Sequence, residues 1–209
     1  MEIQLLLTYL AAITLLTMTP GADTMITIRN SARGGWQDGF VTSIGICSGL
    51  FLHATVSALG ISVILLQSAY AFTLLKLAGA AYLIWLGGAS LLALLKGQGA
   101  FSVPDTAVQT FSARRSLREG FLSNALNPKT ALFYMAFLPQ FINPEGSALM
   151  QSLFLAALHF LIAMIWQSLL AAGVNKARHL LQRPRFSQVF NGLAGSVLVF
   201  LGFKLATSE

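Results

Sequence analysis

The chain has 209 residues, of which 56% are hydrophobic and 10% are charged, and its mean hydropathy is +0.72. A soluble domain of this length cannot bury so much apolar surface, so the composition excludes that class and predicts an all-α polytopic membrane protein. The formal net charge of +6 is compatible with a nucleic-acid partner, but the placement of the basic residues, described below, argues against one.

Apolar runs predict the membrane spans. A spanning helix needs roughly 20 mostly apolar residues, so the chain has room for about six. The predicted spans are Leu5–Ile28, Phe40–Leu66, Tyr70–Leu95, Gly120–Ile142, Ser147–Val174 and Phe186–Phe203. The first run has no Lys or Arg before Arg29, and it therefore lacks the basic start of a cleaved signal peptide. We expect it to be a retained helix and residues 1–209 to form a single membrane domain.

The basic residues are concentrated in every second connection between these spans. Ten of the 13 Lys and Arg residues lie there, namely Arg29, Arg33, Lys96, Arg114, Arg115, Arg118, Lys176, Arg178, Arg183 and Arg185. The connections at 67–69 and 143–146 contain none. By the positive-inside rule the basic connections are cytoplasmic, and both termini are predicted to lie outside a bacterial inner membrane. The net charge is then a topology signal, and no nucleic-acid partner is expected.

The longest connection, 97–116, is rich in Gly, Ser, Thr and Ala and contains Pro104. It is predicted to be a flexible cytoplasmic linker between two halves of the chain, about 1–96 and 117–209. Each half has an odd number of spans, so a repeat of the first half must insert upside down. The expected architecture is therefore a 3+3 inverted repeat.

Proline residues mark the first and fourth spans at corresponding places. Thr19-Pro20-Gly21 lies in the first span and Asn127-Pro128-Lys129 in the fourth. Thr and Asn are favourable helix N-caps, and Pro is favoured at the first helical position, so each motif predicts the start of a half-helix within its span. Two such N-termini at a central cavity favour an anionic or zwitterionic substrate. The alternative is a pair of ordinary kinks that only shape packing.

Two charged residues belong to the first turns of these half-helices. Asp23 and Lys129 are costly inside a bilayer, so we expect them to be paired, hydrated or functional. Lys129 opposes the helix dipole, which predicts an anionic partner. Our hypothesis is that both residues face one cavity, where Asp23 binds a substrate ammonium and exchanges a proton while Lys129 binds a carboxylate. The candidate substrate-binding residues are Thr19, Pro20, Gly21, Asp23, Asn127, Pro128 and Lys129. The alternative is a purely structural Asp23–Lys129 ion pair.

Other polar groups at membrane depth have open roles. His53 and His159 are candidates, with Asp23, for proton coupling, because histidine as a residue type ordinarily changes charge near physiological pH, although a lone buried His is more often only a satisfied core group. Asn124, Gln167 and Asn191 either bond across helices or line the cavity.

The chain's other features indicate packing. Gly45 and Gly49 form a GxxxG motif that serves either internal packing or self-association as a homodimer. With a single Cys, Cys47, and no reactive side-chain grouping, we expect no metal site, no cofactor and no enzymatic activity.

Several segments, in order along almost the whole chain, resemble the lysine exporter superfamily in its homoserine/threonine-resistance branch. The matching segments are Met18-Thr19-Pro20-Gly21 followed by Arg33-Gly34-Gly35 and Gly39; Leu77-Ala78-Gly79-Ala80-Ala81-Tyr82-Leu83 with Leu86-Gly87; Gly120-Phe121 through Asn127-Pro128-Lys129-Thr130-Ala131-Leu132-Phe133 to Phe137-Leu138-Pro139-Gln140-Phe141; and Asn191-Gly192 to Leu201-Gly202. Ala22 departs from the pattern, because many relatives have a second proline there.

This resemblance implies efflux of neutral amino acids such as threonine, homoserine or leucine, driven by the proton gradient. The implied partners are a small zwitterionic substrate, protons and the lipid bilayer. A basic amino-acid substrate stays open. So does an ion or metal-ion exporter or channel of the same fold, which would show no saturable exchange of an organic solute.

Overall fold

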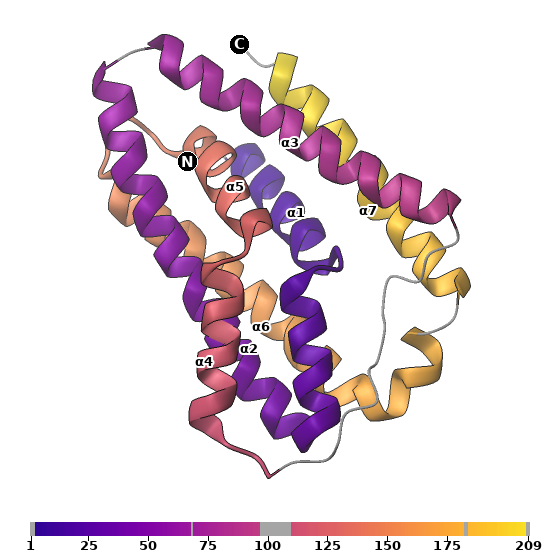
Figure 1. Cartoon of the computed structure of the whole chain (residues 1–209). Helices are drawn as coiled ribbons and strands as arrows, with labels where there is room; N and C mark the ends of the chain where they lie inside the picture. The colour runs from indigo at the N-terminus through magenta and orange to yellow at the C-terminus, as the bar shows by residue number, and fades with distance from the viewer. Residues whose placement is uncertain (1–2, 68, 97–109, 182–183, 208–209) are drawn as a thin grey trace.

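The computed structural model describes residues 3–67, 69–96, 110–181 and 184–207, and it contains only helices and their connections in these ranges (Figure 1). The elements are α1 (Ile3–Met18), α2 (Ala22–Gln67), α3 (Ala69–Leu95), α4 (Ala113–Ala125), α5 (Pro128–Ala136), the short 3-10 helix η1 (Leu138–Phe141), α6 (Ala148–Leu181) and α7 (Pro184–Thr207). The prediction of an all-α chain is confirmed.

Length and composition single out some of these helices as membrane-spanning candidates. Within the described residues, Ala22–Gly60, which includes the bend described below, and Ala148–Val174 each contain an apolar stretch long enough to cross a bilayer, and Ile3–Met18 is a shorter apolar helix. Figure 1 shows the start of α1, the end of α2 and the end of α7 toward one end of the molecule, and the start of α4 at the other.

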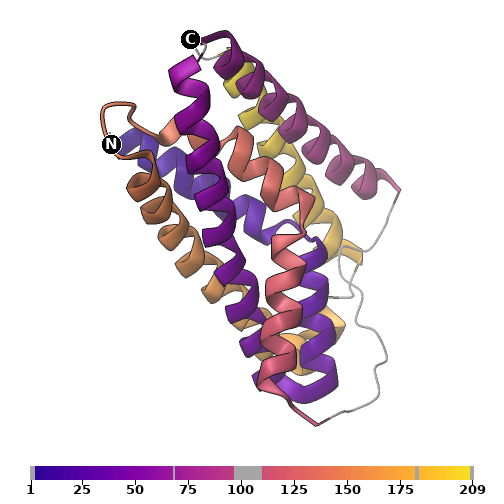
Figure 2. The same ribbon diagram turned by 60° about the vertical axis from the view of Figure 1, so that its left-hand side comes forward.

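The bend in α2 replaces most of the first basic connection predicted from the sequence. Only Gly34 (φ −128°, ψ 16°) and Gly35 (φ 80°, ψ −173°) leave helical geometry, so residues 22–33 and 36–67 are helical on either side. The positive φ of Gly35 is one that glycine adopts without strain. Figures 1 and 2 show the chain reversing direction here. The expected loop is therefore a two-residue bend, because helix formation continues up to the two glycines.

The predicted linker at 97–116 is also too long at its C-terminal end, because α4 begins at Ala113. Residues 97–109 of that prediction lie outside the described residues.

Both proline motifs lie at helix breaks. Between α4 and α5, the Asn127 side chain accepts a hydrogen bond from the backbone N–H of Lys129 at 3.0 Å, and Pro128 is the first helical residue. Between α1 and α2, the Thr19 hydroxyl instead donates to the Leu15 carbonyl at 2.7 Å. The expectation that Thr19 caps the following helix is therefore wrong: it closes the end of α1, and α2 begins only at Ala22. Pro20 accounts only for the end of α1 at Met18, since proline disfavours helical geometry in the residue before it. The hydroxyl that would have capped α2 is bound to the preceding turn instead.

Glycines allow the closest helix contacts. The helix α2 packs against α4 and α6, and α3 packs against α7. A Cβ on Gly45 would collide with the Leu117 carbonyl oxygen of α4, and one on Gly120 with the Thr42 carbonyl oxygen of α2. A Cβ on Gly87 would lie 2.6 Å from the carbonyl oxygen of Gly195 in α7. The GxxxG motif thus serves internal packing. The homodimer stays a prediction, and this motif no longer supports it.

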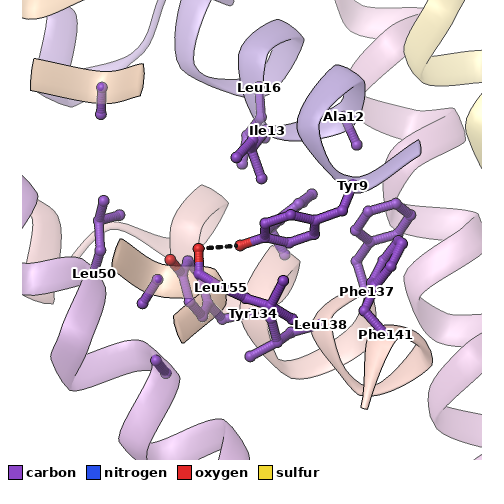
Figure 3. Packing of buried hydrophobic residues seen from close by; sticks show 14 of the residues in the cluster. Tyr9, Ala12, Ile13, Leu16, Leu50, Tyr134, Phe137, Leu138, Phe141 and Leu155 are labelled. Atoms are coloured by element: carbon purple, nitrogen blue, oxygen red, sulfur yellow. Dashed lines mark hydrogen bonds between the residues drawn. The ribbon is translucent and has the colours of Figure 1, made fainter. Parts of the chain in front are cut away.

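An aromatic core joins α1 to the segment after the second helix break (Figure 3). The Tyr9 ring lies against Phe141 with centroids 5.1 Å apart, and its hydroxyl donates to the Leu155 carbonyl of α6 at 3.0 Å. Phe137 and Tyr134 belong to the same buried cluster. This packing fixes α1, α5 and α6 relative to one another and so positions the two helix breaks.

Candidate functional site

A cavity of about 40 Å³ lies where the two helix breaks meet. Its walls come from α1, α2, α4, α5 and α6, and the lining residues are Leu16, Thr17, Thr19, Gly21, Asp23, Thr24, Ile46, Leu50, Asn124, Asn127, Lys129, Thr130, His159, Ala163 and Gln167. At roughly 10–15 Å³ for each water, the space holds about three water molecules and is too small for an amino acid.

Asp23, in the first turn of α2, is held by side chains from the other helix break. Its carboxylate accepts hydrogen bonds from the Ser123 hydroxyl at 2.8 Å, the Asn124 amide at 2.8 Å and the Asn127 amide at 2.9 Å. The acid that the sequence placed in the first span therefore binds to the end of α4 and to the cap of α5. Three neutral donors stabilise the carboxylate without neutralising its charge.

Lys129 makes the corresponding contact in the opposite direction. Its ammonium donates to the carbonyl oxygens of Leu16 at 2.8 Å and Thr19 at 2.6 Å, which lie at the C-terminal end of α1. This end of a helix carries partial negative charge and favours a cation. The predicted anionic partner of Lys129 is therefore replaced by backbone carbonyls. Among the described residues, no Asp23–Lys129 ion pair forms within 4.0 Å, so the structural-pair alternative is wrong.

The seven candidate binding residues divide into two groups. Thr19, Gly21, Asp23, Asn127 and Lys129 line the cavity, whereas Pro20 and Pro128 do not and instead end or begin helices beside it. The sequence therefore placed the charged residues and their neighbours in one cavity, where the two charges lie too far apart for the alternative of a direct ion pair.

The two histidines predicted for proton coupling lie in different places. His159 of α6 lines the cavity, with Nε2 3.0 Å from the Thr17 hydroxyl and Nδ1 3.1 Å from the Tyr134 hydroxyl. His53 does not line the cavity, and its Nε2 lies 2.9 Å from the backbone carbonyl of Asn124. His53 thus contacts the segment that holds Asp23 and does not contact the cavity itself.

The structure also decides the role of two amides that the sequence left open. Asn124 and Gln167 both line the cavity, and the carbonyl oxygens of both side chains are buried without a hydrogen-bond partner among the described residues. The side chain of Asn191 lies outside the described residues. Spacing offered one signal, because His159, Ala163 and Gln167 follow one another every four residues and so share one face of α6.

A second polar group, here called the charged cluster, consists of Arg29, Asn30, Arg33, Asp38, Ser116 and Glu119. Arg33 binds Asp38 through Nε–Oδ2 at 2.9 Å and Nη2–Oδ1 at 3.0 Å, and its Nη1 lies 3.1 Å from Glu119 Oε2. Asn30 and Arg29 also donate to Glu119, at 2.9 and 2.8 Å. The cluster ties both sides of the α2 bend to α4. The positive-inside rule uses only the basic residues of this region, so its acids carried no prediction.

Hydrogen bonds and ion pairs favour the charged form of Glu119, which lies outside the predicted apolar spans. Burial alone would raise the pKa of Glu119, but hydrogen bonds from Arg33 and Asn30 outweigh it and lower that pKa below its ordinary value. Glu119 is therefore held in its charged form.

Comparisons with known proteins place the chain among transporters. The sequence profile described as LysE type translocator matches residues 14–209. The chain is 35% identical to an uncharacterized membrane protein of Bacillus subtilis (strain 168), with 97% of this chain and 99% of the relative covered. It is 31% identical to the homoserine/homoserine lactone efflux protein of Salmonella typhi, over 96% and 95% of the two chains. It is 29% identical to the leucine efflux protein of Klebsiella pneumoniae, over 97% and 95%. No solved structure matches the chain at a significant level.

Proposed function

The chain belongs to the LysE type translocator family of membrane transporters, and we propose that it is a secondary-active exporter of small neutral amino acids that works by proton antiport. The names of two relatives, a homoserine/homoserine lactone efflux protein and a leucine efflux protein, support a neutral amino-acid substrate.

The observation that carries the proposal is the placement of Asp23 and Lys129 in one cavity without an ion pair between them. A carboxylate can accept about four hydrogen bonds and an ammonium can donate three, so each group has capacity beyond the contacts it makes. A zwitterion supplies the missing partners: its ammonium suits Asp23 and its carboxylate suits Lys129. The N-terminus of α5, where Lys129 lies, also favours a carboxylate.

The arrangement of the helices supports a 3+3 inverted repeat. In that scheme α1 with residues 22–33, residues 36–67, and α3 form the first half, and α4 with α5, α6, and α7 form the second. The third member of each half packs against its counterpart, as α3 does against α7. The two breaks also contact each other reciprocally through Asp23 and Lys129. With the basic connections cytoplasmic, both termini lie outside the bacterial inner membrane.

The small cavity suits a contracted state within an alternating-access cycle. A cavity of about 40 Å³ must widen before it admits an amino acid. In the proposed cycle the substrate enters from the cytoplasm and binds Asp23 and Lys129. A proton entering from outside then neutralises Asp23, which weakens its hold on the substrate ammonium and favours outward release.

Transport by purified protein in liposomes tests the proposal. Liposomes that contain the parent, Asp23→Asn or Lys129→Ala are loaded with one of the twenty amino acids or with homoserine. Each preparation is assayed for counterflow and for export driven by a pH gradient. We expect saturable export of a few neutral amino acids. The transport rate of each variant should be at least about thirtyfold lower than that of the parent, since losing a buried charge partner costs about 2 kcal/mol or more.

Glu145→Gln is the matched control, because it makes the same kind of change at an exposed connection away from the cavity. It should transport like the parent. If folded parent protein moves no amino acid, or conducts ions without saturable exchange, the proposal is wrong. If Asp23→Asn keeps normal export driven by a pH gradient, another group carries the proton.

A further inference from the structure

Gln167 is a buried polar group whose hydrogen-bonding capacity the structure leaves partly unused. Its side chain is 3% exposed, lines the cavity and has a carbonyl oxygen, Oε1, with no partner among the described residues. Buried acceptors are nearly always paired in native proteins, and an unpaired one is costly. Its position in a transport cavity suggests that a donor reaches Oε1 when the substrate is bound.

Gln167 is separate from the groups that would hold the zwitterion. Asp23 is bound by residues of α4 and by Asn127, and Lys129 by the end of α1. In the described structure α6 makes no hydrogen bond or ion pair with either charge. Asn124, whose carbonyl oxygen is also unpaired, donates its amide directly to Asp23 and so belongs to the ammonium side. Gln167 is therefore the unpaired acceptor that is left for the remainder of the substrate.

The surroundings of Gln167 leave room for a small side chain. Ala163 lies one turn earlier on the same face of α6 and contributes only a methyl group to the cavity wall. Other parts of the lining, Leu16, Ile46 and Leu50, are apolar. The rest of the lining is largely polar, but most of those side chains already have partners, as Thr17 does in His159 and Asn127 does in Asp23.

We propose that Gln167 determines side-chain specificity: its Oε1 accepts a hydrogen bond from a substrate hydroxyl, so the protein selects small hydroxyl-bearing amino acids over aliphatic ones of the same shape. This inference rests on the proposed function. A site built to hydrogen-bond a substrate group rejects an analogue that lacks it, because binding that analogue leaves the buried acceptor unpaired.

Pairs of substrates that differ only in the hydroxyl group test the inference. Threonine is compared with valine, and homoserine with norvaline, as competing substrates in a counterflow assay in proteoliposomes. The parent should prefer the hydroxyl member of each pair by at least about tenfold. In Gln167→Met, which keeps the length of the side chain but removes the acceptor, both ratios should fall to near one because the hydroxyl-bearing substrates lose their advantage.

The control is Gln4→Met, the same substitution at an exposed position of α1, which should keep the parent ratios. Equal transport of threonine and valine by the parent would overturn the inference and leave amino-acid export standing. So would a uniform loss for all four substrates in Gln167→Met, which is the result expected if Gln167 only binds water. If the parent transports no amino acid, it is the proposed function that fails.

Ligand stabilisation of the parent decides the question even if Gln167→Met folds poorly. A ligand that binds only the folded protein raises its thermal midpoint according to its affinity. Threonine should stabilise the detergent-solubilised parent at concentrations at least about tenfold lower than valine requires. Stabilisation at equal concentrations contradicts the inference.

Discussion

The cavity lining and the charged cluster both gather polar side chains near helix ends. The two regions differ in how many of these side chains have hydrogen-bond or ion-pair partners. In the cluster, Asp38 is fully buried and bound by Arg33 through two hydrogen bonds, and Glu119 accepts from three different side chains. In the cavity, the charged groups Asp23 and Lys129 contact only neutral partners, and two amide oxygens have none among the described residues.

This difference separates structural from binding roles. A charge network with its members paired fixes the geometry of the helices that it joins. A network with spare acceptors and separated charges instead retains binding capacity for a ligand at a cost in stability. Substitutions in the cluster should therefore change folding stability, and substitutions in the cavity should change transport.

Loss of Asp38 tests the structural role most severely. Asp38→Ala leaves the buried Arg33 guanidinium without its two-bond partner, and breaking a buried ion pair in this way costs about 3–5 kcal/mol. Thermal unfolding in detergent should show a large loss of stability. Glu145→Ala, at an exposed acid, should show none. An unchanged midpoint for Asp38→Ala would contradict the structural role of the cluster.

The close contact of α2 with α4 beside the cluster predicts a smaller effect. In Gly120→Ala the new methyl group collides with the Thr42 carbonyl oxygen, and such overpacking costs about 1–3 kcal/mol. Gly88→Ala is the matched control, because a Cβ there meets nothing within 4 Å. The control should be neutral or more stable by up to about 1 kcal/mol, since alanine favours helix over glycine. Equal midpoints in the two variants would show that α2 and α4 separate easily.

We expect substitution of Glu119 to have the smallest effect on folding stability, and this effect depends on pH. Its pKa is lower in the folded protein than its ordinary value of 4.5, so its contribution to stability is complete above that value and is lost as the pH falls through the lower folded pKa. Glu119→Gln should therefore cost about 1 kcal/mol at pH 7, and this cost should shrink as the pH is lowered through the folded pKa. Unfolding of parent and variant at a series of pH values below 7 gives the difference. A cost that does not change with pH would mean that the carboxylate acts through shape and not through charge.

Local chemistry explains the parts of the site that the sequence predicted. Proline and its neighbours act within a few residues, so the motifs Thr19-Pro20 and Asn127-Pro128 located both helix breaks. The cost of charge in an apolar segment likewise singled out Asp23 and Lys129. The prediction of a half-helix starting at Thr19 failed because its hydroxyl found a partner in the preceding turn, at Leu15.

Contacts between distant segments account for what the sequence missed. Nothing local in the chain indicates that Lys129 binds the carbonyls of Leu16 and Thr19, or that Glu119 meets Arg33. The acids of the charged cluster were overlooked because the positive-inside rule uses only Lys and Arg.

The sequence by itself determined the helical class, the family, the helix breaks and the charges that needed an explanation, because hydrophobicity, proline geometry and charge are properties of short segments. Only the tertiary structure decided which partners those charges have and which polar groups remain unpaired. That depends on how helices far apart in the chain pack together, as when the α5 lysine reaches the end of α1 and leaves Gln167 of α6 with a free acceptor beside the cavity.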